Sequence, residues 1–105
     1  MKEKIYLARS NKKDKKYMVR IGNKTVHFGA EGMSDFTKHK DPSRKKNYIS
    51  RHGGMGENWN KSGLKTAGFW SRWLLWFKPT IKESIEGIEK KFNVQISRGN
   101  PPGGW

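Results

Sequence analysis

Cysteine is missing from the 105-residue sequence, and acidic and apolar residues are scarce. Without cysteine the chain cannot form disulfides, Cys-ligated zinc sites or a thiol nucleophile, which fits a reducing compartment. Hydrophobic residues make up only 32% of the chain, but aromatic residues reach 12%, a share that argues against disorder. A chain of this length has room for one domain. We therefore expect a single small domain with an aromatic core.

Positive charge dominates the composition. Lysine and arginine number 23 against 9 aspartate and glutamate residues, which gives a net charge of +14. Most of the excess lies between residues 9 and 51, where 13 basic residues face 4 acidic ones. Such a field attracts polyanions without reading their sequence, although a short basic run can also be an ordinary solvated surface. The residues that we expect to contact a polyanion are Lys12, Lys13, Lys15, Lys16, Arg20, Arg44, Lys45, Lys46 and Arg51.

Period-two alternation of apolar residues predicts three strands, over residues 4–10, 15–21 and 24–28. Gly22-Asn23 suits a two-residue hairpin turn, so we expect these strands to form an antiparallel meander. Residues 29–41 contain glycines and no sustained period, which is typical of a connecting loop. A short fourth strand is predicted at residues 94–96.

Helix signals follow in the second half of the chain. Asp41-Pro42 begins a short basic helix that should stop at Gly53-Gly54. Thr66 is a candidate N-cap for residues 67–77, and Thr80, with Glu83 at capping-box spacing, for residues 81–92. The predicted fold is α+β: a small three- to four-stranded antiparallel sheet packed against two C-terminal helices, plus the short basic helix. Residues 1–96 would form the domain, and residues 97–105 a Gly/Pro-rich tail.

Three of the five tryptophans lie in the helix predicted at residues 67–77. Eleven residues span about 16 Å, roughly half of the hydrocarbon thickness of a bilayer, so this helix cannot cross a membrane. At 100° per residue, Trp70, Trp73, Leu74 and Phe77 share the face that should pack in the core. Aromatic residues beyond that face are favoured at protein contacts. The residues that we expect to dock on a protein partner are Phe69, Leu75, Trp76 and Trp105.

Enzymatic motifs are not recognisable in the sequence. His27, His39 and His52 match no zinc or catalytic spacing, and no close carboxylate pair lies in an apolar setting. The glycine clusters lack the context of a phosphate-binding loop. The N-terminus also lacks the apolar run of a signal peptide. We expect a protein that is not an enzyme and has no metal, cofactor or small-molecule substrate.

Two long segments resemble a known protein family. They are "KTVHFGAEGMSDFTKHKDPSRKKNYISRH" and "ENWNKSGLKTAGFWSRWLLWFKPTIKESIEGIEKKFNVQI". The resemblance extends from Lys15 to Ile96, and the family consists of small basic proteins encoded by large nucleocytoplasmic DNA viruses. Phe77 and the glycine-rich segment before Trp59 depart from the shared phrases. The resemblance implies a viral origin, a place in the virion or host cytoplasm, and a structural or packaging role.

Two functions remain open at this stage. The first is a structural, minor-capsid or cement-type protein that docks on other virion proteins through its aromatic edge and turns its basic face to an acidic partner, such as viral DNA or an acidic membrane surface. The second is a nucleic-acid-binding protein that packages or condenses the viral genome without sequence specificity. The residues alone do not separate them.

Overall fold

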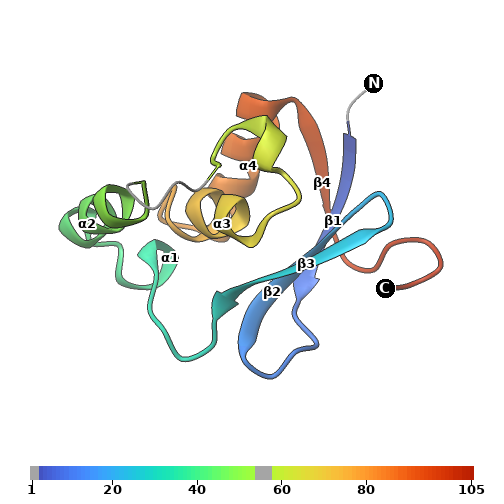
Figure 1. The fold of residues 1–105 in the computed structure, drawn as a ribbon, viewed down its shortest axis with the longest axis horizontal. Helices are drawn as coiled ribbons and strands as arrows, with labels where there is room; N and C mark the ends of the chain where they lie inside the picture. The colour runs from blue at the N-terminus through green and yellow to red at the C-terminus, as the bar shows by residue number, and fades with distance from the viewer. Residues whose placement is uncertain (1–2, 54–57) are drawn as a thin grey trace.

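Four strands form one mixed sheet in the computed structural model, which describes residues 3–53 and 58–105 (Figure 1). Within the described residues the strands are β1 Glu3–Arg9, β2 Lys15–Ile21, β3 Lys24–Ala30 and β4 Val94–Arg98. Their order across the sheet is β3-β2-β1-β4. The α+β fold class and the antiparallel β1-β2-β3 meander are confirmed. The fourth strand differs from the expected orientation, because β4 pairs parallel to β1.

Local sequence explains the meander. The β2–β3 turn places Gly22 at a φ of 60° and pairs Ile21 with Lys24, which matches a two-residue hairpin turn with glycine first. Successive side chains point to opposite faces of a sheet, so every second residue of each strand faces the helices. The buried residues on this face are Ile5, Leu7, Val19, Ile21, Val26 and Phe28.

The helices fill the connection from β3 to β4. Among the described residues they are α1 Phe36–His39, α2 Pro42–Gly53, the 3-10 helix η1 Lys61–Gly63, α3 Ala67–Trp70, the π-helix η2 Ser71–Leu75 and α4 Ile81–Phe92. In Figure 1, α3 and α4 lie beside the sheet, while α1 and α2 lie beyond α3. Since this connection brings the chain back to the start of β1, β4 enters the sheet parallel to β1.

Several predicted helix ends are confirmed. The Thr66 hydroxyl accepts a hydrogen bond from the Phe69 N–H at 3.4 Å, and the Thr80 hydroxyl accepts one from the Glu83 N–H at 3.1 Å. Asn93 ends α4 with a left-handed φ of 55°. The basic helix ends at Gly53, and Gly54, the second residue of its predicted stop, lies outside the described residues.

The tryptophan helix departs from regular α geometry. It is α-helical only from Ala67 to Trp70, continues as η2, and ends at Leu75, two residues short of Phe77. A π-helix has more residues per turn than an α-helix, so positions counted at 100° per residue are wrong over this segment. Trp70, Trp73 and Leu74 lie in the core as predicted, whereas Phe77 is only partly buried.

Two predicted docking residues are part of the core instead. Phe69 is 0% exposed and lies between Trp70 and Phe92, with ring centroids 5.3 and 5.0 Å away. Leu75 is 2% exposed, because the π turn rotates it towards the end of β3 at Gly29. The prediction that Phe69 and Leu75 form an exposed edge is therefore wrong.

The C-terminal residues fold back on the sheet. β4 includes Ser97 and Arg98, which the sequence analysis assigns to the tail, and the Gly99 N–H donates to the Leu7 carbonyl at 2.9 Å. The Arg20 guanidinium donates to the carbonyl of Trp105 at 2.7 Å. Within the described part of the chain, no helix is long and apolar enough to cross a membrane.

Candidate nucleic-acid interface

A cleft of about 350 Å³ lies where the ends of β2 and β3 meet α2 and α3. Lys15 of β2 and Arg51 of α2 both line it, although they are 36 positions apart in the sequence. The interior is largely apolar and includes Phe28 and Leu75. The structure thus brings two of the predicted basic groups to the rim of one hollow.

Gly29 permits the close packing on which the cleft depends. Its φ is 77°, and a Cβ at this position would lie 2.8 Å from Cδ1 of Leu75 and 3.3 Å from Cβ of Lys16. Any larger residue would be strained at this φ and would force the Leu75 side chain to move. Glycine therefore suits the close approach of the Leu75 side chain to β3.

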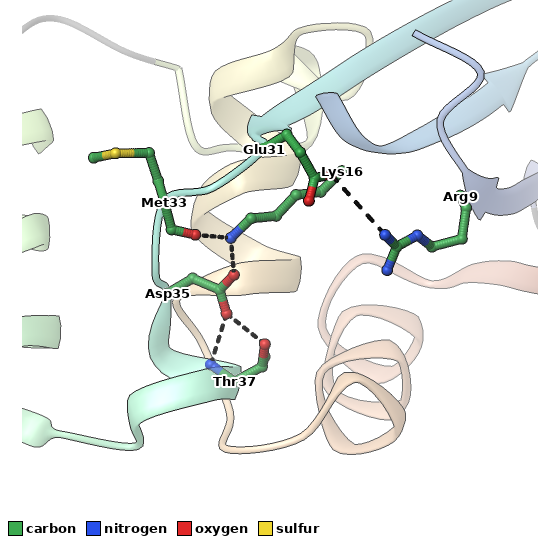
Figure 2. Close-up of polar contacts among 6 residues, drawn as sticks. All are labelled: Arg9, Lys16, Glu31, Met33, Asp35 and Thr37. Atoms are coloured by element: carbon green, nitrogen blue, oxygen red, sulfur yellow. Dashed lines mark hydrogen bonds and ion pairs between the residues drawn. The ribbon is translucent and has the colours of Figure 1, made fainter. Parts of the chain in front are cut away.

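Lys16 and Asp35 form a buried ion pair beside the cleft (Figure 2). The Lys16 Nζ lies 2.6 Å from the Asp35 carboxylate and also donates to the Met33 carbonyl, while both side chains are at most 5% exposed. The second carboxylate oxygen of Asp35 accepts the Thr37 N–H at 2.9 Å and caps α1. The prediction that Lys16 contacts a polyanion is wrong, because this lysine is enclosed with its own counterion.

The same contacts give structure to residues predicted as a plain loop. Asp35 and Phe36 are buried, as the N-cap and the first residue of α1, whereas Met33 is 64% exposed. One charged residue of the loop, Glu31, contacts Arg9 at 3.9 Å across an exposed pair, also drawn in Figure 2. The segment is therefore held at Asp35 and at the Met33 carbonyl, while the Met33 side chain is exposed.

Lys12, Lys13 and Lys15 lie at the β1–β2 connection. The Lys12 N–H donates to the Ser10 hydroxyl at 3.0 Å, and that hydroxyl lies 2.8 Å from Nδ1 of His27. Burial lowers the pKa of His27, and the positive charge of Lys12 lowers the pKa further. Lys12 and Lys13 are exposed and Lys15 is half-buried. This end of the sheet therefore has a positive potential next to the cleft.

The basic residues of α2 divide by helical angle. Arg44 and Arg51 are about two turns apart and share one side, so Arg44 extends the line of positive charge from the cleft. Lys46 is exposed and lies about 200° around the helix from Arg44. Lys45 is half-buried and its Nζ donates to the Phe77 carbonyl at 2.6 Å. Burial, with the charges of Arg72 and Lys78, lowers the pKa of Lys45.

Arg20 serves a different surface. Besides the Trp105 carbonyl, its guanidinium donates to the Thr25 hydroxyl and to the Gly22 carbonyl, both at 3.1 Å. Arg20 and the tail line a separate hollow of about 220 Å³, away from the cleft with Lys15 and Arg51. Arg20 therefore does not belong with the other predicted polyanion-binding residues.

A stack of rings forms the α2 wall of the cleft. The rings of Tyr48 and Trp76 are 4.3 Å apart and nearly parallel at 5°, and Tyr48 also stacks on His52 at 4.2 Å. Trp76 is half-buried, so it retains some of the exposure predicted for it. Trp105, the fourth predicted docking residue, is also half-buried.

Sequence reasoning missed part of this site. Ser34, Ala67 and Ser71 line the cleft, but nothing in their local sequence distinguishes them from ordinary loop and helix residues. It also missed the use of Arg72, whose guanidinium lies 4.4 Å from the Trp73 ring centre and donates to the Trp76 carbonyl at 2.7 Å. Burial lowers the pKa of Arg72. The spacing of Arg72 between two tryptophans was the available signal for a cation–π contact.

Metal ligands do not gather at this site. In the described residues, no group of three or more histidine, cysteine, aspartate or glutamate side chains could hold a metal ion. The chemistry that the cleft offers is charge attraction, hydrogen bonding and apolar contact.

Comparison with known proteins gives a family of unknown function. Residues 5–52 match the model of a family described as a family of unknown function, DUF5754. The matched segment contains the meander except for the first two residues of β1, together with α1 and nearly all of α2, and every predicted polyanion-binding residue lies within it. Searches among curated proteins and among solved structures find no match. The similarity therefore extends over the basic half of the chain and carries no named activity.

Proposed function

We propose that this protein is not an enzyme and that it binds the phosphate backbone of nucleic acid without sequence specificity. One observation carries the proposal: Lys15 and Arg51, from opposite ends of the basic segment, line one cleft and have no acidic partner among the described residues. Lys12 and Lys13 add exposed charge at the neighbouring loop. Clustered cations of this kind bind phosphates by releasing the counterions that surround nucleic acid.

The acidic residues near the cleft do not cancel this charge. Asp35 is the only acidic residue among the described residues that line the cleft, and its carboxylate is paired with Lys16. Asp14 lies in the same connection as Lys12 and Lys13, which outnumber it. The local field therefore stays positive, as nonspecific phosphate binding requires.

The biological setting is a further part of the proposal. On the basis of the resemblance to proteins of large DNA viruses, we propose that the chain acts in the virion, and in the host cytoplasm during assembly, where it would package or condense the viral genome. Detection of the protein in gradient-purified particles by mass spectrometry tests this setting. Its absence from such particles would refute the setting and leave the binding chemistry to be judged separately.

Docking on other virion proteins is the second candidate. The partial exposure of Trp76 and Trp105 favours it, because exposed tryptophans are common at protein contacts. The burial of Phe69 and Leu75 leaves this role a smaller surface than the sequence predicts. We therefore place nucleic-acid binding first.

The binding experiment measures affinity for a labelled DNA duplex by fluorescence anisotropy between about 50 and 200 mM salt. We expect the logarithm of the affinity to fall linearly with the logarithm of salt concentration. A variant with Lys12, Lys13, Lys15 and Arg51 changed to glutamine should reduce the slope by about 3 to 4, since each lost phosphate contact removes about 0.9.

The matched control changes four other exposed lysines, Lys61, Lys65, Lys82 and Lys90, to glutamine, which gives the same net charge. None of these four lines the cleft. The control should keep most of the slope. No binding at 50 mM salt would refute the proposal, and equal loss of slope in the two variants would refute the assignment to the cleft side.

A further inference from the structure

The cleft is suited to a single nucleotide and not only to the outside of a duplex. We propose that it accepts one unpaired nucleotide of a single strand, with the base against its apolar interior and the adjoining phosphates on Lys15 and Arg51. This inference rests on the proposed function and specifies its substrate class. It predicts that the protein prefers single-stranded over double-stranded nucleic acid.

The size of the cleft supports one nucleotide as the occupant. Its volume of about 350 Å³ lies at the low end of the range of about 300–1,000 Å³ that is typical of small-molecule sites. A base in a duplex is stacked and paired on all sides, and it must be turned out before it can enter such a hollow. A single strand presents its bases without that cost. The cleft therefore favours unpaired strands by geometry.

The lining complements both parts of a nucleotide, the base and the phosphate. Trp76, Ala30 and Ala67 provide exposed or half-buried apolar surface for a base, with the buried Phe28 and Leu75 behind them, while Lys15 and Arg51 provide positive charge for the phosphates. Aromatic and basic groups side by side are the usual composition of sites for single strands. The faces of the Tyr48 ring are covered by His52 and Trp76, so the base would lie along the wall of this stack instead of between its rings.

Two hydroxyls give the site polar contacts that suit any base. Ser34 and Ser71 line the cleft, and neither side chain forms a hydrogen bond to another described residue. A serine hydroxyl both donates and accepts, so it can meet an amino group or a carbonyl group on a base edge. This tolerance agrees with binding that does not read sequence.

The walls of the cleft are preformed. The buried Lys16–Asp35 pair holds the loop on one side, and the contact of Gly29 with Leu75 holds η2 against β3 on the other. A rigid site avoids the entropy that a flexible loop would lose on binding. The nucleotide would therefore enter a hollow that exists in the free protein.

The first experiment compares a thymidine 12-mer with a DNA duplex that carries the same number of phosphates, by anisotropy at one salt concentration. We expect at least about tenfold tighter binding of the single strand, since only an unpaired base can enter the cleft without first leaving a duplex. Ala30→Leu with Ala67→Leu, both exposed residues of the cleft lining, should fill the hollow without changing charge. This variant should bind the single strand no tighter than the duplex.

The control variant is Gln95→Leu with Ser97→Leu, two exposed residues of β4 that do not line the cleft. It should keep the preference for the single strand. Equal affinity of the wild type for both DNA forms, or an unchanged preference in the filled variant, would overturn the inference. In either case salt-dependent duplex binding would survive, whereas failure of the proposed function would remove binding of both forms.

A second measurement uses the unaltered protein, so it does not depend on a variant that folds. Thymidine 5′-monophosphate is titrated while the indole N–H resonance of Trp76, which lines the cleft, is followed by NMR. We expect a saturable shift of this resonance, with little change at Trp70, which is 0% exposed. No shift at Trp76, or a shift confined to the tail residue Trp105, would contradict the inference.

Discussion

Lys15 and Lys16 are neighbours on β2, yet the fold uses them in opposite ways. Lys15 is half-buried at the rim of the cleft and has no acidic partner among the described residues, whereas Lys16 is 5% exposed and paired with Asp35. Successive side chains of a strand point to opposite sides, so adjacent residues of one type enter different environments. A basic run in the sequence can therefore contain both a binding residue and a structural one.

The tryptophans divide in the same way. Trp73 is buried and its indole N–H donates to the Trp59 carbonyl at 2.8 Å, while Trp76, three residues later, is half-buried at the cleft. In both pairs the buried member should govern stability and the other member should govern binding.

The largest effect is expected at the buried ion pair. Asp35→Asn keeps a cap acceptor for α1 but leaves the Lys16 charge without its partner, which should lower the free energy of unfolding by about 3–5 kcal/mol. Chemical denaturation measures this loss. In the double variant Lys16→Met with Asp35→Asn, the unpaired charge is gone, and much of the stability should return. A loss below about 1 kcal/mol in Asp35→Asn would show that the pair is not structural.

A comparable loss is expected in the tryptophan helix. Trp73→Ala should lower the free energy of unfolding by about 3–5 kcal/mol, because it leaves a cavity and an unpaired carbonyl at Trp59. Trp76→Ala should cost roughly half as much, since its ring is already partly in solvent. Thermal melts and single-strand binding should be measured together. If Trp73→Ala and Trp76→Ala lower the melting temperature equally and bind the single strand equally well, the two tryptophans do not have separate roles in stability and binding.

A smaller effect, seen in binding and not in stability, is expected for cations of the two surfaces. Lys15→Gln with Arg51→Gln should reduce the salt slope of DNA binding by about 2, with the melting temperature nearly unchanged. The matched pair Arg20→Gln with Lys24→Gln removes the same charge from the other hollow and its adjoining turn. If the Arg20→Gln, Lys24→Gln variant reduces the slope by as much, the assignment of the DNA interface to the cleft is wrong.

The smallest effect is expected from pH. The pKa of His27 in the folded state lies below its usual 6.5, mainly because of burial and the charge of Lys12. Lys15 lowers this pKa slightly further, and Asp14 raises it in part. The unfolded chain therefore takes up this proton first as pH falls, so stability should decrease below about pH 6.5. His27→Gln should weaken this pH dependence in thermal melts between pH 7.5 and 5.5. If the pH dependence of stability is unchanged in His27→Gln, it arises from another titrating group.

Local patterns predicted the meander and the helix caps because those features depend on residues close in sequence. Alternation at period two set the faces of β1 to β3, the hydroxyls of Thr66 and Thr80 cap the starts of their helices, and Asn93 ends α4 in a left-handed conformation. The parallel placement of β4 depends on where the whole helical connection returns the chain, which no short pattern contains.

The candidate site was only partly predictable for a similar reason. Charge count indicated a basic surface, but the burial of Lys16 depends on Asp35, 19 positions away. The burial of Leu75 depends on a π turn that the 100° periodicity cannot represent. The cleft itself arises from four separate segments and has no sequence motif of its own.

Binding of a single strand at the cleft can be tested directly by mapping amide NMR shifts as a thymidine 12-mer is added to the protein. We expect the largest shifts in residues 12–15, at Ser34, at Arg51 and at Ser71, with Arg20 and β4 nearly unchanged. Shifts centred on Arg20 and the C-terminal tail, or no shifts at low salt, would contradict binding at the cleft.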